Sequence, residues 1–213
     1  MPTRAAAPSR RTRGGVALPA KFYDRDTEQV ARDLLGAVLR HTTVDGVASG
    51  RIVETEAYLG EHDLACHAAA GLTQRTRWLY GAPGTAYVYF IYGVHWCFNA
   101  VTRTVGSPSA VLVRAIEPLE GVELMRERRD TSRERDLTNG PGKLCEALGI
   151  TGALNGMRLR GSAIEILRGE EIPDARVVVT PRIGITKSAE WPLRWYVEGN
   201  PYVSKTPKHL RPG

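Results

Sequence analysis

The chain has 213 residues, of which 42% are hydrophobic and 24% are charged, as in an ordinary globular protein. This length fits one domain or two small ones, and the composition excludes collagen, a coiled coil and wholesale disorder. The longest apolar runs are far shorter than the roughly 18 residues that a membrane-spanning helix needs. We therefore expect a soluble protein that has no membrane partner.

Positive charge is concentrated at the two ends of the chain. The formal net charge is +6, yet residues 1–14 hold four arginines without an acid, and residues 201–213 hold three basic residues without an acid. Basic tails suit a polyanionic partner such as nucleic acid, and the alternative is that they only improve solubility. We expect flexible basic tails at residues 1–18 and 205–213, on either side of one domain at residues 19–204.

The three cysteines, Cys66, Cys97 and Cys145, are odd in number and far apart, and no CxxC pair suggests a zinc ribbon or a redox dithiol. Free thiols in a reducing cytoplasm are the expectation. The N-terminus has no apolar segment of the kind that a secretory signal contains, although its composition slightly resembles a transit peptide. The sequence thus predicts a cytoplasmic protein.

An amphipathic helix is the first regular element predicted. Val30, Leu34 and Val38 recur at every fourth residue after Thr27, which has the side chain of an N-cap. This pattern predicts a helix of about three turns. We expect Gly36 to end it early.

A β-hairpin follows this helix. Residues 39–44 and 47–58 are β-prone and flank Asp45-Gly46, a pair that readily takes the positive φ angles of a tight turn. The next stretch, residues 59–83, has scattered Gly, His, Thr and Arg and little periodicity. A loop of that length is usually functional.

A second hairpin is predicted from residues 85–91 and 94–102, which are joined by Tyr92-Gly93. Tyr87 and Tyr89 share one face of its first strand. A large aromatic residue at a hairpin tip is unusual, because Asn, Asp or Gly normally stand there. A wedge that enters a stack of bases would explain Tyr92. The alternative is a tip that folds back on the protein or forms an interface.

Strands and helices continue through the rest of the chain. We expect strands at residues 109–116, 164–167, 177–179 and 193–197, helices at residues 119–129 and 141–148, and a charged loop at residues 130–136. Pro141 suits the first position of its helix, where the missing N–H costs nothing. Runs of strands with a few helices between them indicate an α+β fold with a mainly antiparallel sheet.

Two carboxylates and a phenol follow one another along the second strand of the first hairpin. Glu54, Glu56 and Tyr58 share one face because strand side chains alternate with a period of two. This row could supply a general base beside a recognition ring, and the alternative is a solvated strand face. Arg114 interrupts an apolar strand and would need a carboxylate partner if buried, for which Glu56 is a candidate.

Two further clusters suggest ligands only weakly. His62, Cys66 and His67 lie in one loop without a recognised metal-binding spacing, so we expect no metal and no cofactor. Residues 140–143, with the sequence GPGK, precede a helix and bring free N–H groups near a lysine, as at phosphate-binding helix ends. They lack the spacing of a Walker A loop.

Taken together and in this order, these segments resemble the alkyladenine (3-methyladenine, or methylpurine) DNA glycosylase family. The resemblance runs from about residue 22 to residue 204. It is carried by ETEAY at 54–58, YVYFIYG at 87–93 with Asn99, LVRAIEPLEG at 112–121, GPGKL at 140–144, RIGI at 182–185 and PYVS at 201–204.

The resemblance implies a single domain with a curved, mainly antiparallel sheet, surrounding helices and a protruding hairpin that enters the DNA minor groove. It implies a base-excision-repair enzyme that works as a monomer on double-stranded DNA containing damaged purines. Such an enzyme flips an alkylated or deaminated purine out of the duplex and hydrolyses its N-glycosidic bond, leaving an abasic site. The protein would then act near the nucleoid of a bacterium or in the nucleus of a eukaryote.

The resemblance also assigns the residues of hydrolysis. Glu56 matches the general base that activates the water, and Arg114 and the backbone carbonyl of Ile183 match the groups that help to hold it. No lysine lies among the matched pocket residues, so we expect a monofunctional glycosylase that does not cut the strand. Lys143 is expected to contact a DNA phosphate instead, and Glu54→Gln is expected to matter less than Glu56→Gln.

The remaining matched positions would recognise the flipped base. Tyr58, His67 and Tyr89 match the pocket that stacks on the base and hydrogen-bonds it, and Asn99 matches the position that crowds the exocyclic amino group of guanine. Tyr92 matches the tyrosine that takes the place of the base in the duplex. The loop around residues 72–80 differs from the corresponding loop of mammalian members of the family. The sequence therefore does not rank 3-methyladenine, 7-methylguanine, hypoxanthine and ethenoadenine as substrates.

Two other functions remain as alternatives. The aromatic hairpin and the basic tails could belong to a protein that binds damaged or distorted nucleic acid without catalysis. A metal hydrolase that uses His62, Cys66 and His67 is the third possibility. Release of a base from alkylated duplex DNA distinguishes the glycosylase from the non-catalytic binding protein. Activity in the presence of a chelator excludes the metal hydrolase.

Overall fold

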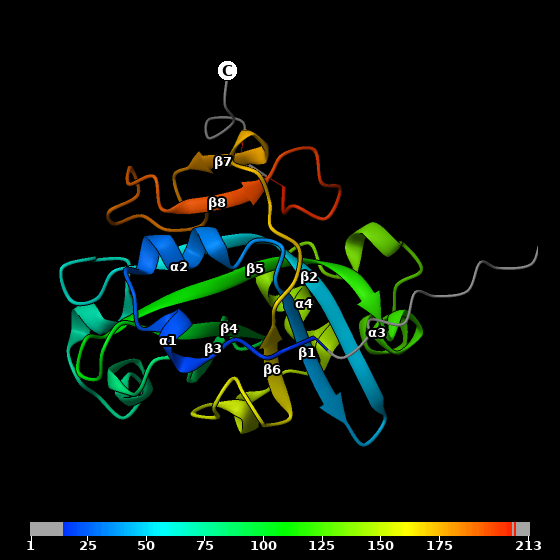
Figure 1. Ribbon diagram of the computed structural model, residues 1–213, viewed down its shortest axis with the longest axis horizontal. Helices are drawn as coiled ribbons and strands as arrows, with labels where there is room; N and C mark the ends of the chain where they lie inside the picture. The colour runs from blue at the N-terminus through cyan, green and yellow to red at the C-terminus, as the bar shows by residue number, and fades with distance from the viewer. Residues whose placement is uncertain (1–14, 206, 208–213) are drawn as a thin grey trace, which may run out of the picture.

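The fold is organised around the long strand β2 (Gly46–Tyr58), which pairs with three other strands. The computed structural model describes residues 15–205 and residue 207 (Figure 1). Within these residues one eight-stranded sheet has the order β3-β4-β5-β2-β1-β6, and β8 pairs with both β2 and β7. Every pairing is antiparallel. The predicted α+β fold with a mainly antiparallel sheet is confirmed.

Helices cover both faces of this sheet, with α2 in front of β5 and α4 behind it in Figure 1. The other strands are β1 (Val38–Thr43), β3 (Ala86–Ile91), β4 (His95–Thr102), β5 (Ser109–Glu120), β6 (Ile164–Leu167), β7 (Val177–Thr180) and β8 (Arg194–Val197). The described α-helices are α1 (Ala20–Tyr23), α2 (Thr27–Asp33), α3 (Val122–Arg129) and α4 (Pro141–Leu148). Short 3-10 helices are η1 (His67–Ala70), η2 (Arg77–Tyr80), η3 (Glu134–Asp136), η4 (Gly152–Leu154) and η5 (Asp174–Arg176).

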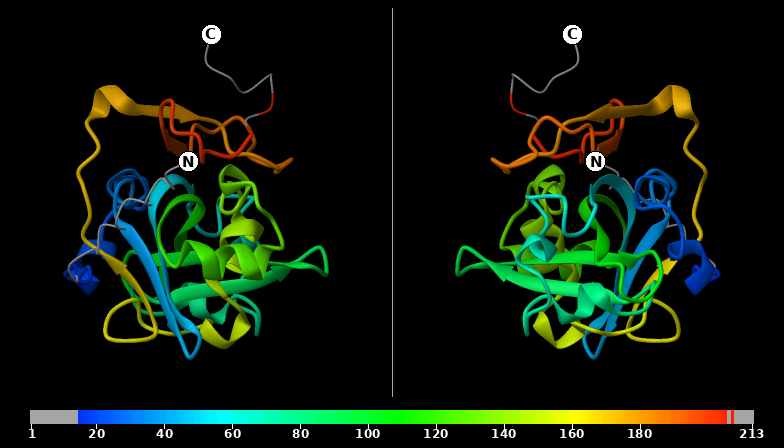
Figure 2. Two further views of the ribbon diagram at one scale, coloured as in Figure 1. Left: turned by 90° about the vertical axis from the view of Figure 1, so that its right-hand side faces the viewer. Right: turned by 90° about the vertical axis from the view of Figure 1, so that its left-hand side faces the viewer.

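Both predicted hairpins are confirmed. β1 and β2 pair across Val44 and Asp45, one residue earlier than the predicted turn, because Gly46, with a φ of 136°, already pairs with Thr43 as the first residue of β2. β3 and β4 pair across Tyr92, Gly93 and Val94, and the φ angles of Tyr92 and Gly93 are 55° and 69°. Two positive φ angles are typical of the type I′ turn, whose twist matches that of the strands. Figure 2 shows the β3–β4 hairpin projecting from the rest of the protein.

The helix that was predicted after Thr27 is α2, which starts one residue earlier than predicted and is shorter. Asp26, not Thr27, is the N-cap, because its carboxylate accepts hydrogen bonds from the backbone N–H groups of Glu28 and Gln29. Thr27 is buried and its hydroxyl pairs with that of Thr102 on β4. A side chain committed to a distant strand cannot cap its own helix, and the sequence pattern does not reveal that partner.

The boundary between β5 and α3 also differs from the prediction. Residues 119 and 120 were predicted in a helix, but β5 continues to Glu120 and pairs there with Ser49 of β2. The left-handed Gly121 then reverses the chain into α3. Pro118 is tolerated within the strand at a place where the register to β2 shifts. Pairing with a long partner strand has therefore overridden the local helix propensity.

The N-terminal segment joins the fold earlier than predicted. Leu18 donates its N–H to the carbonyl of Ile166, and Arg168 donates to the carbonyl of Val16, so residues 16–18 lie along β6. The rest of the two predicted basic tails, except residues 205 and 207, lies outside the described residues. In the described part of the chain no helix is long and apolar enough to cross a membrane.

Two apolar clusters hold the sheet and its loops together. The larger cluster lies between the sheet and the helices α2, α3 and α4. The smaller one lies under the 59–83 loop, where Leu79 and Ala68 pack against Val101 and Ala110. The three cysteines are buried free thiols, as predicted. The long loop is thus packed on the sheet by its apolar side chains.

Gly121→Ala should destabilise the fold strongly. A Cβ atom at Gly121 would lie 2.2 Å from the carbonyl oxygen of Val47, and φ is 72°. A left-handed conformation alone costs a non-glycine residue roughly 1–2 kcal/mol, and the clash adds to that cost. Gly161→Ala is the matched control, because φ is 69° there but no described atom lies within 4 Å. Urea unfolding should show a clearly larger loss for Gly121→Ala, and equal losses would contradict the clash.

Candidate active site

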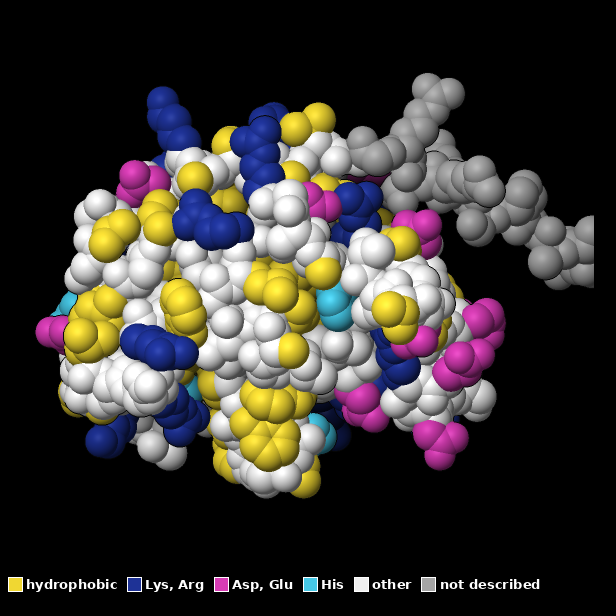
Figure 3. Space-filling model, turned by 90° about the horizontal axis from the view of Figure 1, so that it is seen from below, with side chains coloured by type: hydrophobic (Ala, Val, Ile, Leu, Met, Phe, Trp, Pro, Cys, Tyr) yellow, Lys and Arg dark blue, Asp and Glu magenta, His cyan; other side chains and the backbone are white. Residues whose placement is uncertain are grey.

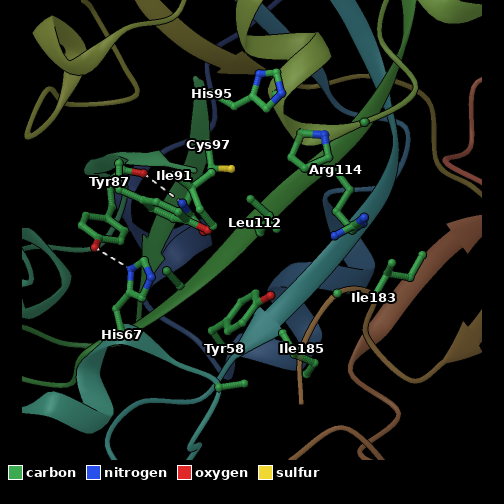
Figure 4. Close-up of a pocket in the computed structure, with 18 of the residues that line it drawn as sticks. Tyr58, His67, Tyr87, Ile91, His95, Cys97, Leu112, Arg114, Ile183 and Ile185 are labelled. Carbon is green, nitrogen blue, oxygen red and sulfur yellow. Dashed lines mark hydrogen bonds between the residues drawn. The ribbon is translucent and has the colours of Figure 1, made fainter. Parts of the chain in front are cut away.

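A pocket of about 490 Å³ opens between the β3–β4 hairpin, the 59–83 loop, the start of α4 and residues 183–185. Figure 4 shows its lining, in which aromatic rings lie on one side and Arg114 on the other. The volume falls in the range of pockets that hold small organic ligands. Most of the lining is apolar, with a few polar groups from β2, β4 and β5 among it. Such a lining suits a flat, mostly apolar ligand with a few polar edges.

Glu56 lies directly behind the wall of this pocket and is fully buried. Its Oε1 accepts the N–H of Ile183 at 2.8 Å, and its Oε2 accepts the Tyr58 hydroxyl at 3.0 Å and Arg114 Nη1 at 3.2 Å. All three donors line the pocket. A carboxylate offers about four acceptor positions, so one position of Glu56 is left for a further donor such as water.

Glu54 is also fully buried and has more donors than Glu56. It accepts hydrogen bonds from Arg114 Nε at 3.1 Å, Arg194 Nε at 2.7 Å, and both the N–H and the hydroxyl of Ser204 at 2.8 Å. Burial alone would raise the pKa of Glu54, but Arg114, Arg194 and the Ser204 N–H outweigh it and lower the pKa. The alternative of a solvated strand face is therefore wrong.

Arg114 joins the two carboxylates, and a pair of β-bulges places it there. Ile52 pairs with Ile116 and Glu54 with Ala115, but Thr55 then pairs with Val113, so Arg114 has no directly opposite residue in the described ladder. Bulges of this kind occur beside active sites, where they redirect a side chain. Burial would lower the pKa of Arg114, but the Glu56 and Glu54 charges raise it above its ordinary value.

Arg182 and Asp63 fix the segment that carries Ile183. Their side chains are fully buried and form two hydrogen bonds, and Arg182 Nη1 also donates to the carbonyl of Ala57 at 3.0 Å. The guanidinium lies 4.7 Å from the Tyr58 ring centroid. Sequence reasoning missed this pair. Arg182 lies in the matched RIGI motif, but no local signal links it to an aspartate more than 100 residues away.

Three aromatic residues form the opposite side of the pocket. The ring centroids of His67 and Tyr89 are 4.4 Å apart with their planes at 71°, and His67 Nδ1 lies 2.9 Å from the Tyr87 hydroxyl. The predicted pocket residues His67 and Tyr89 are thus brought together. Tyr87 was noted only as sharing a strand face with Tyr89, and its part in holding His67 became visible only in three dimensions.

Asn99 and Tyr58 complete the set of predicted pocket residues. Asn99 is buried on β4, and its Nδ2 donates to the carbonyl of Tyr87 at 3.0 Å, which fixes the orientation of the amide. Burial first, and then the Glu56 charge, raises the pKa of Tyr58 well above its ordinary value, so the phenol stays protonated. Tyr58 is therefore a hydrogen-bond donor to Glu56.

Tyr92 is at the tip of the hairpin and is 79% exposed, with Val94 and Phe90 exposed beside it. Figure 3 shows an apolar projection at the lower edge of this face, with Lys and Arg side chains on the flanking surface. A non-glycine residue with a φ of 55° carries conformational strain. The alternative in which the tip folds back on the protein is excluded by this exposure.

Lys143 lies at the rim of the pocket on the first turn of α4. Its Nζ donates to Asn139 Oδ1 at 2.7 Å and lies 3.8 Å from Asp136 Oδ1. A phosphate contact by Lys143 stays a prediction. His62 packs near Trp191 with ring centroids 6.2 Å apart, and residues 15–205 hold no group of three His, Cys, Asp or Glu side chains that could bind a metal.

Arg75→Gln should raise the pKa of His67. Burial first, and the nearby Arg75 second, lower that pKa from 6.5 to about 4. Arg75 Nη2 lies 3.5 Å from His67 Nε2. Since burial remains in the variant, NMR titration should give a value between about 4 and 6.5. Arg77→Gln, in the same loop but over Trp78, is the control and should change nothing. An equal pKa in both variants would contradict the contact.

The same shift predicts how stability depends on pH. The unfolded imidazole takes up a proton near pH 6.5 and the folded one only near pH 4. The contribution of His67 to stability is thus complete above about pH 6.5 and is lost as the pH falls toward 4.

Comparison with known proteins gives consistent matches over most of the chain. The family model for methylpurine-DNA glycosylase matches residues 21–201. Relatives from Methanoculleus marisnigri, Salinibacter ruber and Myxococcus xanthus are 49%, 50% and 47% identical, and the matches cover 89%, 88% and 89% of this chain. They cover 100%, 96% and 94% of those relatives, each of which carries a provisional name as a 3-methyladenine DNA glycosylase.

Proposed function

The chain belongs to the methylpurine-DNA glycosylase family, and from this premise we propose that it removes alkylated purines from duplex DNA by hydrolysing their N-glycosidic bonds. The observation that carries the proposal is the position of Glu56. This carboxylate is buried behind a pocket of about 490 Å³ with an aromatic wall, and its three donors all come from the pocket wall.

In the proposed reaction, a water molecule enters with the flipped nucleotide and takes the remaining acceptor position of Glu56. Arg114 and the backbone carbonyl of Ile183 help to hold it in place. The water oxygen attacks C1′ of the sugar, the bond from C1′ to the purine nitrogen breaks, and its electron pair leaves with the base. Glu56 accepts the proton of the water. The negative carboxylate also favours the positive charge that develops on the sugar.

The leaving group explains why one carboxylate would suffice. A purine methylated at N3 or N7 is cationic, so it departs as a neutral molecule and needs no proton from an acid. The aromatic faces of Tyr58 and Tyr89 suit such a cation. Because the pKa of His67 is lowered to about 4, its imidazole is neutral at physiological pH and does not repel the base. Substrates of this class therefore fit the charge of the pocket.

The proposal includes hydrolysis without strand cleavage. Lyase activity needs an amine next to C1′, and the lysine that lines the described pocket, Lys143, is at the rim with its Nζ bonded to Asn139. We expect a monofunctional enzyme that acts as a monomer on double-stranded DNA, in the cytoplasm or nucleoid. A protein that binds lesions without catalysis is the competing function, and base release decides between them.

Glu56→Gln should abolish most hydrolysis while lesion binding persists, because the amide keeps the shape of the carboxylate but cannot accept the proton. General-base catalysis is worth about 10² to 10⁴ in rate. The measurement is single-turnover release of 7-methylguanine from a methylated duplex, beside a binding titration. Glu120→Gln, an exposed change at the end of β5, is the control and should keep the wild-type rate. Excision by Glu56→Gln within a few fold of wild type would contradict the assignment.

Tyr92→Asn should weaken base flipping without weakening the fold. Asn-Gly is the preferred pair for this turn, so the variant relieves the strain of a tyrosine at positive φ. It also removes the ring that would fill the vacated stack, and unstacking costs a few kcal/mol. Fluorescence of ethenoadenine in a duplex reports flipping, and thermal melting reports stability. Tyr92→Phe keeps the ring and should flip normally; equal flipping by Tyr92→Asn would show that the tip has only a structural role.

A further inference from the structure

We propose that Glu54 is a positioning residue that keeps Glu56 basic, by holding Arg114 through Nε and offsetting the charge of its guanidinium group. This inference rests on the proposed function, in which Glu56 is the base. Its starting point is that the two carboxylates differ in their surroundings although they are only two residues apart on β2. Glu56 is bonded to groups of the pocket wall, whereas Glu54 is bonded to Arg194 and Ser204 behind it.

The contacts of Glu54 connect it to Glu56 through Arg114. Four donors bond to the Glu54 carboxylate, two from arginines and two from Ser204. Three of them bond to Oε1, and the Ser204 N–H bonds to Oε2. Neither glutamate lines the pocket itself. Arg114 does line it, and its Nε bonds to Glu54 while its Nη1 bonds to Glu56, so the influence of Glu54 would pass through Arg114.

Glu54 supplies one of the negative charges beside Arg114. Arg182 pairs with Asp63, Arg114 pairs with both glutamates, and Arg194 pairs with Glu54. The groups that face Glu56 are Tyr58 from β2, Tyr89 from β3, Cys97 from β4, Arg114 from β5, and Arg182 from the segment after β7. Glu54→Gln removes one negative charge from this cluster. In a buried site that charge acts with little screening.

Loss of that negative charge would make Glu56 a weaker base, because the neighbouring guanidinium group of Arg114 would then favour the ionised carboxylate more strongly. Glu54→Gln should therefore move the acid side of the pH–rate profile to lower pH and lower the plateau rate about tenfold, less than the loss of the base itself. A merely structural role would lower the rate at every pH and leave the midpoint in place. The position of the midpoint therefore separates the two roles.

The experiment is single-turnover release of 7-methylguanine from a methylated duplex between about pH 5 and 9, with melting recorded at each pH. Leu39→Ala, a core change on β1, is the control for lost stability and should leave the midpoint unchanged. Arg194→Gln removes a positive charge beside Glu54 and should move the midpoint to higher pH. This variant tests the inference even if Glu54→Gln does not fold. A midpoint equal to wild type in either folded variant would overturn the inference.

The outcomes also separate this inference from the proposed function. If the wild type releases no base, or if Glu56→Gln releases it normally, the proposed function is wrong and the role of Glu54 falls with it. If the wild type releases the base and Glu56→Gln does not, but the midpoint of Glu54→Gln is unchanged, only the role of Glu54 is wrong. Glu54→Asp keeps the charge and should return the midpoint toward the wild-type position, which a shift caused by misfolding would not do.

Discussion

The shared guanidinium of Arg114 is the interaction on which the site and much of the fold depend. Burying a carboxylate costs several kcal/mol unless donors surround it, and here two carboxylates are buried side by side. The donors come from β2, β5, β8, the segment after β7 and Ser204, so the cluster is stable only when all of these segments are in place.

The geometry of β2 explains why the site lies at this end of the sheet. One edge of β2 pairs with β1 up to Arg51 and with β8 from Glu54, while the other edge pairs with β5 from Ser49 to Tyr58. The bulges lie where the neighbour changes, and they place Arg114 between the carboxylates. On the pocket side, the projecting hairpin supplies the aromatic wall from its base and the strained Tyr92 from its tip. One continuous sheet thus links the buried carboxylates to the projecting hairpin.

Local patterns predicted the elements that depend on neighbouring residues. Both hairpins, the helix that Pro141 opens and the three late strands were predicted from periodicity and turn residues, and the structure has them. The errors occurred where a distant partner outweighs local preference. Thr27 bonds to Thr102 instead of capping its helix, and β5 continues through Pro118 because β2 pairs with it. Alternation along β2 also grouped Glu54 with Glu56 correctly, without showing that both are buried.

The sequence by itself determined the fold class, the family resemblance and several of the residues that line the pocket, because short motifs and alternating patterns are local properties. Only the tertiary structure decided which donors each carboxylate receives. Asp63 and Arg182 are 119 residues apart and Glu54 and Ser204 are 150 apart, and no local pattern predicts such contacts. Two glutamates of identical chemistry therefore differ in their surroundings, because folding gives one three donors from the pocket wall and the other four buried donors.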